Sequence, residues 1–200
     1  MKECAIVGKP NAGKTLFLVN FAEFLGLREL ELTVNLPGGL SLKRRFTTES
    51  ARRELVSPRP HETLALQSAE VKLPVRKTVQ LVQLTDTSGL VDGIHESPEV
   101  RQAMVQTLRK LRNADLIIHL VDADRAANGD EVVTELDFQI ARYASRRGGY
   151  LVLANKMDRP GAIQGYRRLK ILMKGYPVLP ISALYRQGFK EVKAFVWRCL

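Results

Sequence analysis

The chain has 200 residues, of which 45% are hydrophobic and 26% are charged. This balance is typical of one compact globular domain, expected over residues 1–200, and it excludes a disordered, collagen-like or disulfide-scaffold protein. Lys and Arg outnumber Asp and Glu by 31 to 21, and the net charge of +10 favours phosphate polymers or anionic surfaces as partners, with a solvated basic surface as the alternative. No apolar run reaches the roughly 18 residues of a membrane span, and the start has no signal-peptide core, so we expect a cytoplasmic protein without a transmembrane segment.

Short apolar runs that predict buried strands alternate with segments of helical periodicity. The strands are expected at 4–7, 79–84, 116–121, 150–154 and 176–181. The helices are expected at 14–25, 98–113, 130–146, 161–174 and 185–200, and Trp197 in the last of them is expected in the core. This alternation is typical of an α/β protein with a mainly parallel sheet covered by helices on both faces.

The stretch from 35 to 70 interrupts this alternation. It is polar and rich in arginine, has no clear period, and is punctuated by Pro37, Pro58 and Pro60. We interpret it as a long loop or insertion. Because structureless loops of this length are uncommon in compact domains, we also expect a local helix or hairpin within it.

A glycine-rich motif, Gly-Lys-Pro-Asn-Ala-Gly-Lys-Thr, occupies residues 8–15 between the first expected strand and the first expected helix. Its pattern and position are those of a phosphate-binding loop, in which inward-pointing N–H groups and the helix N-terminus hold phosphates. We expect Lys14 to reach the β- and γ-phosphates and Thr15 to offer its hydroxyl to Mg²⁺. The nucleotide-binding residues expected here are Gly8, Asn11, Ala12, Gly13, Lys14 and Thr15.

A second motif, Asp86-Thr-Ser-Gly89, comes directly after the expected strand 79–84. The carboxyl ends of strands are where open α/β sheets bind ligands, so Asp86 is the expected acidic partner of Mg²⁺. The N–H of Gly89 would then bond the γ-phosphate, and the residues after it would respond to the presence of that phosphate.

A third motif, Asn155-Lys156-Met-Asp158, follows the expected strand 150–154. The carboxylate of Asp158 can accept hydrogen bonds from N1–H and the exocyclic amine of guanine, a donor pair that adenine does not present. This motif therefore predicts a guanine nucleotide, GTP or GDP, rather than ATP. After the last expected strand, Ser182, Ala183 and Leu184 would offer a backbone N–H to the guanine carbonyl.

These motifs, in this order, resemble those of the translation-factor-related GTPases, the superclass that includes Era, Obg and the tRNA-modifying MnmE. The shared patterns are Gly-x-Pro-Asn-x-Gly-Lys-Thr, Asp-Thr-x-Gly, Asn-Lys-x-Asp and Ser-Ala-Leu, and the likeness covers nearly the whole chain. The segments 45–48 and 86–96 are most similar to the Obg branch. The resemblance implies a P-loop NTPase fold with a mostly parallel six-stranded sheet, helices on both faces and an enlarged switch I region at 35–70.

The resemblance also implies a switch I threonine that joins the Mg²⁺ site when GTP is bound. Thr48 is the expected residue and Thr47 its competitor, and either can instead be a plain loop hydroxyl. The expected catalytic set is therefore Lys14, Thr48 and Gly89, and the expected metal ligands are Thr15, Thr48 and Asp86. The stretch between Thr15 and Asp86 is longer than in the family pattern, which leaves the choice between Thr47 and Thr48 open.

Two further positions bear on hydrolysis. Leu90 stands where many GTPases have a water-orienting glutamine, so we expect slow intrinsic hydrolysis that depends on another device or on a partner. In potassium-activated relatives an asparagine at the position of Asn11 helps to hold K⁺, which makes K⁺ a second candidate cofactor. The alternative is that Asn11 only stabilises the loop.

We therefore expect a molecular switch that hydrolyses GTP to GDP and phosphate, in ribosome assembly or RNA-linked regulation. Its expected partners are ribosomal RNA or a ribosomal subunit, or else a protein effector or a second copy bound through the switches. The alternative function is a nucleotide-gated RNA- or protein-binding module with negligible hydrolysis of its own. The chain stops one helix after Ser182, without the accessory domain of Obg and Era, so it is either a minimal switch or a fragment.

Overall fold

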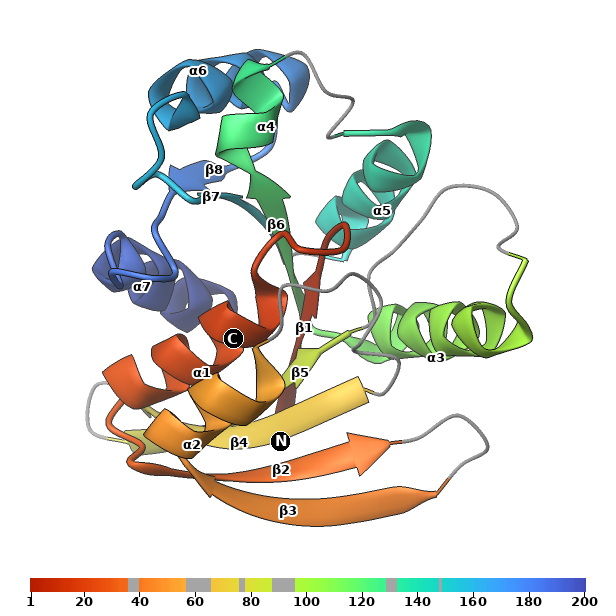
Figure 1. Cartoon of the computed structure of the whole chain (residues 1–200), viewed down its shortest axis with the longest axis vertical. Coiled ribbons are helices and arrows are strands. Elements are labelled where there is room, and N and C mark those ends of the chain that lie inside the picture. The colour runs from red at the N-terminus through yellow and green to blue at the C-terminus, as the bar shows by residue number, and fades with distance from the viewer. Residues whose placement is uncertain (36–39, 57–65, 76–77, 88–95, 129–132, 148) are drawn as a thin grey trace.

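In the computed structural model the chain forms one eight-stranded sheet with helices on both sides (Figure 1). The structure describes residues 1–35, 40–56, 66–75, 78–87, 96–128, 133–147 and 149–200. The strands are β1 (Lys2–Val7), β2 (Glu29–Asn35), β3 (Ser41–Thr47), β4 (Leu66–Val75), β5 (Thr78–Asp86), β6 (Leu116–Asp122), β7 (Tyr150–Asn155) and β8 (Val178–Pro180). The helices are α1 (Lys14–Phe24), α2 (Thr48–Leu55), α3 (Pro98–Asn113), α4 (Ala123–Ala127), α5 (Glu135–Arg146), α6 (Ala162–Leu172) and α7 (Phe189–Cys199).

The parallel half of the sheet consists of the five strands expected from the apolar runs. The strand order is β3-β2-β4-β5-β1-β6-β7-β8, and each pairing from β5 to β8 is parallel. The carboxyl ends of these strands therefore lie along one edge of the sheet, where the phosphate loop follows β1 and Asp86 ends β5. The expected α/β fold with a mostly parallel sheet is confirmed.

The stretch 35–70 was expected to be a long loop or insertion, but β3, α2 and the start of β4 lie within it, and β2 lies directly before it. These strands raise the strand count from the expected six to eight. β2 pairs with β3 and with β4, and β4 pairs with β5, all antiparallel. β3 is an edge strand in which six of the seven side chains are exposed and Phe46 is buried, so it has no apolar run to reveal it. Lys43 and Arg45 of β3 instead pair with Glu31 across the strand boundary. The expected hairpin and helix of this region are thus β2–β3 and α2.

The first parallel strand shows how the sheet separates two cores. Side chains alternate along a strand, so Cys4 and Ile6 of β1 enter one cluster and Ala5 and Val7 enter the other. The first cluster is covered by α1, α2 and α7, and the second by α3, α4, α5 and α6. Because both faces are buried, these strands read as continuous apolar runs rather than as alternating ones.

The helices of the parallel half agree with the expected ones except around residue 130. The expected helix 130–146 corresponds to α5, which begins at Glu135, and an additional short helix, α4, directly follows β6. Asp122 accounts for α4, because its carboxylate accepts hydrogen bonds from the N–H groups of Asp124 (3.1 Å) and Arg125 (3.3 Å) and thereby caps this helix. None of the described helices has the length and hydropathy of a membrane-spanning segment.

An aromatic cluster fixes α7 against α1. The ring of Phe189 meets those of Phe17, Phe21 and Phe24 edge-on, with centroids 5.5, 5.5 and 5.7 Å away. This packing matters for function because α1 begins at the phosphate loop and α7 follows the expected base-binding residues. Trp197, by contrast, is 42% exposed, so the expectation that it belongs to the core is wrong.

We predict that Phe21→Ala lowers the free energy of unfolding by about 4 kcal/mol, because it leaves a cavity in the aromatic cluster. Trp197→Ala on α7 is the control and should lower it by no more than about 1.5 kcal/mol, since much of that ring already contacts water. Chemical denaturation of the two variants measures both values. Equal losses would contradict the assignment of the core.

Candidate nucleotide-binding site

The phosphate loop runs from the end of β1 into α1, and two of its positions require glycine. Gly13 has a φ of 97° and a Cβ there would lie 2.5 Å from the side-chain nitrogen of Asn155. Gly8 has a φ of 143°, and a Cβ there would lie 2.2 Å from the carbonyl oxygen of Leu120. The loop is therefore pressed against the ends of β6 and β7, with glycines where another side chain would collide.

Lys14 is the first residue of α1, and its side chain folds back over the loop. Its Nζ donates a 3.1 Å hydrogen bond to the carbonyl oxygen of Lys9. The side chain is almost fully buried, and burial lowers the pKa of Lys14 while the nearby Asp86 carboxylate opposes that shift. A cation held this way beside a helix N-terminus is suited to an anionic ligand.

Thr15 and Asp86 come together although 71 residues separate them in the chain. The Thr15 hydroxyl donates to Asp86 Oδ2 at 2.5 Å, whereas Asp86 Oδ1 is buried without a hydrogen-bond partner. Burial raises the pKa of Asp86 to about 6, against the opposing effects of Lys14 and of hydrogen bonds from Thr15 and Thr87. A buried carboxylate with one unsatisfied oxygen, next to a hydroxyl, fits a hard divalent cation such as Mg²⁺.

The described residues contain no cluster of three or more His, Cys, Asp or Glu side chains that would hold a metal ion alone. A cation at Thr15 and Asp86 would accordingly need other oxygen ligands, and Mg²⁺ characteristically takes them from phosphates and water. This donor set therefore suits a metal that arrives with a phosphorylated ligand.

Asn155 at the end of β7 links the phosphate loop to the turn that follows β8. Its Nδ2 donates to the carbonyl oxygen of Ala12 at 2.8 Å, and its Oδ1 accepts from the N–H of Ala183 at 2.9 Å. Asn155 is 2% exposed, so both bonds form away from water. A single amide thus fixes the position of the two loops relative to each other.

Asp158 lies beside the same turn. The Ser182 hydroxyl donates to Asp158 Oδ1 at 2.5 Å and accepts a 3.2 Å bond from the N–H of Tyr185. This arrangement holds the carboxylate in place and leaves its other oxygen outside these bonds. Leu184, the third residue of the expected base-binding tripeptide, is 55% exposed.

Lys156, between these two residues, has a left-handed backbone with a φ of 67°. Its Nζ donates to Asp122 Oδ2 at 2.6 Å. A cavity of about 240 Å³ lies against the phosphate loop here, and its charged lining residues are Lys9, Asp122, Arg125, Lys156 and Arg159. The surroundings of the loop are thus predominantly basic.

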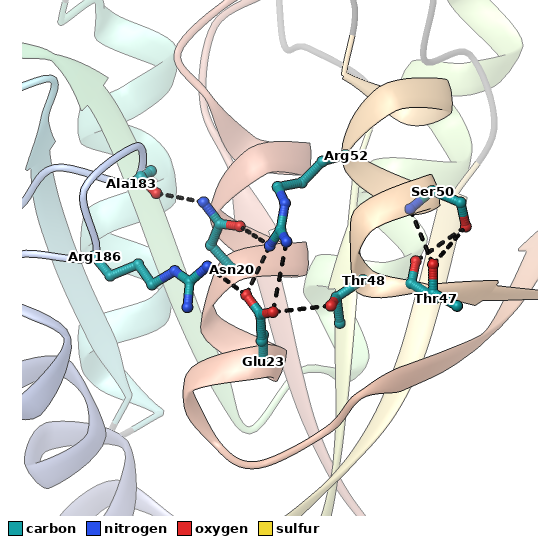
Figure 2. Close-up of polar contacts among 8 residues, drawn as sticks. All are labelled: Asn20, Glu23, Thr47, Thr48, Ser50, Arg52, Ala183 and Arg186. Carbon is teal, nitrogen blue, oxygen red and sulfur yellow. Dashed lines mark hydrogen bonds and ion pairs between the residues drawn. The ribbon is translucent and has the colours of Figure 1, made fainter.

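Thr47 and Thr48 have partners other than Thr15 and Asp86, and Figure 2 shows these partners. Thr47 caps α2, its hydroxyl accepting from the N–H of Ser50 at 3.1 Å. Thr48 is buried, and its hydroxyl donates to Glu23 Oε1 at 2.9 Å. Glu23 comes eight residues after Thr15, so it lies about 12 Å further along α1. The metal-binding role of Thr48 stays a prediction that requires α2 to move, and Gly89 and Leu90 lie outside the described residues.

Sequence reasoning missed several residues that hold this site together. Asp122 ends β6, so the logic of strand ends that selected Asp86 could also have found it. After Lys14 and Thr15, Asn20 and Glu23 are the polar positions of the otherwise apolar helix α1, which is a weaker signal. Nothing in the local sequence indicated that Arg52 of α2 and Arg186, near the base-binding tripeptide, contact Glu23.

A family model and curated relatives match this chain. The family model described as "50S ribosome-binding GTPase" matches residues 41–156. GTPase Der of Methylibium petroleiphilum is 30% identical over 94% of this chain and 36% of its own length. GTPase Obg of Bacillus licheniformis is 31% identical over 54% of this chain and 26% of its own length. This chain therefore corresponds to only part of these curated relatives.

Solved structures share the fold at low sequence identity. Era of Aquifex aeolicus, bound to GDP.AlF4−, has a TM-score of 0.67 and 21% identity over all of this chain and 57% of its own. Era in complex with MgGDPNP and nucleotides 1506–1542 of 16S ribosomal RNA has a TM-score of 0.65 and 20% identity, covering 100% of this chain and 56% of its own. More than half of this chain matches the family model, so the protein belongs to the 50S ribosome-binding GTPase family.

Proposed function

We propose that this chain binds GTP and GDP with Mg²⁺ and hydrolyses GTP to GDP and phosphate as a molecular switch. The observation that carries the proposal is the Asn155 amide, bonded to Ala12 of the phosphate loop and to Ala183 of the turn beside Asp158. Two loops with different chemistry, one for phosphates and one for a base, are thereby held at a fixed separation. A nucleotide is the ligand that has both groups.

Different residues of the site would bind the phosphates and Mg²⁺. Lys14 and the loop N–H groups would neutralise the phosphates, and the positive end of α1 would add to their effect. Thr15 and Asp86 would hold Mg²⁺, since the unpartnered Oδ1 of Asp86 offers the ligand that a hard cation needs. When bound, Mg²⁺ would neutralise charge that develops on the phosphate oxygens. From the resemblance, Thr48 and Gly89 would join the γ-phosphate side in the GTP state.

Guanine selectivity is the first test of this proposal. In Asp158→Asn the carboxylate that accepts from N1–H and the 2-amine is replaced by an amide, so GDP affinity should fall by roughly a hundredfold while ADP affinity stays the same. Xanthosine diphosphate, which has a carbonyl in place of the 2-amine, should bind the variant better than GDP does. Equilibrium binding measures the affinities for the three diphosphates. Glu191→Gln, at an exposed position of α7, is the matched control. Unchanged GDP preference would contradict the role of Asp158.

Hydrolysis itself is tested by phosphate release from GTP in KCl and in NaCl. We expect slow turnover, because Leu90 cannot orient water, and a rise of about tenfold or more in KCl if K⁺ at Asn11 neutralises transition-state charge. Asn11→Gly should lose the response to K⁺ yet retain GDP affinity, since glycine tolerates the φ of 61° at this position.

Asn113→Gly at the exposed end of α3 is the control for that variant. Equal turnover in both salts would assign Asn11 to loop stability alone. GDP binding without phosphate release in either salt would contradict the hydrolase proposal and favour the second candidate, a nucleotide-gated binding module without hydrolysis of its own.

We also propose a ribosomal subunit or its RNA as partner, with action in the cytoplasm. The family description and the Era complex with 16S ribosomal RNA support this, as does the net charge of +10. Co-sedimentation with ribosomal subunits should succeed with a non-hydrolysable GTP analogue, fail with GDP and weaken steeply as salt rises. Absence of binding in both states would contradict this partner and point to a protein effector or to dimerisation through the switches.

A further inference from the structure

A polar cluster links α1, α2 and the turn 182–187 (Figure 2). Asn20 and Glu23 are one turn apart on α1 and point toward α2 and toward the loop that carries Ala183 and Arg186. Both of them bind Arg52 of α2. The cluster therefore joins the switch I region to residues expected to hold the base.

Asn20 uses both ends of its amide in this cluster. Its Nδ2 donates to the carbonyl oxygen of Ala183 at 2.7 Å, and its Oδ1 accepts from Arg52 Nη1 at 2.9 Å. Asn20 is 2% exposed, so water cannot readily replace either partner. The Ala183 peptide is consequently held on both sides, its N–H by Asn155 and its carbonyl by Asn20.

Glu23 is shared by α2 and the base-binding turn. Its Oε2 lies 2.7 Å from Arg52 Nη1 and 2.6 Å from Arg186 Nη2, and its Oε1 accepts from Thr48. The hydrogen bond from Arg52 is the main cause of the lowered pKa of Glu23, with contributions from Thr48 and Arg186. The side chains of Arg52 and Glu23 are 29% and 24% exposed, which makes this ion pair better shielded than those of the β2–β3 hairpin.

The turn that receives these contacts is tight and has little freedom of its own. Ser182 and Gln187 exchange two backbone hydrogen bonds of 3.2 Å, and Arg186 lies inside the turn with a left-handed φ of 58°. Arg186 is thus placed by a strained backbone and held by Glu23. A shift of Glu23 would be passed to the turn as a whole.

We propose that Arg52 is a positioning residue for guanine recognition, which acts through Asn20 and Glu23 and couples α2 to the turn 182–187. The proposal rests on the proposed function, since it assigns that turn to the base. Loss of Arg52 leaves the buried Asn20 Oδ1 without its donor and removes one of the two cations on Glu23. Both anchors of the turn on α1 are weakened together, while the phosphate loop keeps its own contacts.

The coupling works in both directions because linkage is reciprocal. Thr48 and Arg52 both lie on α2 and both bind Glu23, so a movement of α2 that brings Thr48 toward Thr15 and Asp86 must break both contacts. A nucleotide whose base holds the turn in place would accordingly favour the α2 position seen in the structure. Release of α2 would loosen the hold on the base.

The test compares Arg52→Ala with Arg53→Ala, its neighbour in the last turn of α2, which is exposed and has no described polar partner. GDP should dissociate about fivefold faster from Arg52→Ala than from Arg53→Ala, the change expected from losing one orienting hydrogen bond. ADP affinity should be equal in the two variants, because ADP makes the phosphate contacts without the guanine contacts. Melting temperatures verify that both variants are folded.

Arg186→Ala removes the other cation that binds Glu23, the one supplied by the turn. This variant tests the inference even if Arg52→Ala does not fold. It should also speed GDP dissociation, and Arg52→Ala with Arg186→Ala should show less than the product of the two single effects, because both act through Glu23.

Two results would overturn the inference: dissociation from Arg52→Ala within twofold of Arg53→Ala, or an equal loss of GDP and ADP affinity, which indicates a purely structural role. A wild-type chain that does not prefer GDP over ADP would instead refute the proposed function, and the inference with it.

Discussion

The arrangement of the site depends on one buried amide, that of Asn155. It can bond Ala12 and Ala183 at once because β7 ends level with β6, and both strands extend past the end of β1, which places the last residue of β7 between the two loops. The same contact requires glycine at position 13, since a side chain there would collide with the amide nitrogen of Asn155. The contacts of Asn155 therefore restrict the residue at position 13, the register of β7 and the position of the turn that follows β8 together.

Burial of the charged residues of the site costs desolvation free energy, which a ligand of opposite charge would offset. Lys14 and Asp86 are both buried, and burial shifts the pKa of each toward its neutral form. Their mutual attraction offsets part of this cost, but Asp86 Oδ1 still lacks a partner. Phosphate beside Lys14 and a cation beside Asp86 would supply the missing counter-charges. Binding energy is thus stored as desolvated charge in the free protein, a pattern common at functional sites.

The sequence was sufficient for the elements whose signals are local. The phosphate loop, the strand before it and the helix after it follow from spacing alone, and α3 begins at Pro98 because Ser97 caps it. The hairpin β2–β3 could not be found the same way, since a polar edge strand is held by cross-strand pairing and not by apolar burial. Likewise the family pattern selects Thr48, but its partner is determined by where α2 docks, which depends on Glu23 far away in sequence.

The way α2 is held suits the switch role proposed for the region between the phosphate loop and Asp86. Of its residues only Thr48 and Ala51 are buried, so few apolar contacts attach it to the core. Its attachment to α1 consists mainly of hydrogen bonds and ion pairs to Asn20 and Glu23. α7, in contrast, is locked to α1 by aromatic packing. The partly exposed contacts of Glu23 can be exchanged for contacts with water or with a ligand at a lower cost than opening a buried aromatic cluster. Asn20 and Glu23 also hold the turn 182–187. The helix α2, which is less firmly attached than α7, is therefore connected to the turn that is proposed to bind the base.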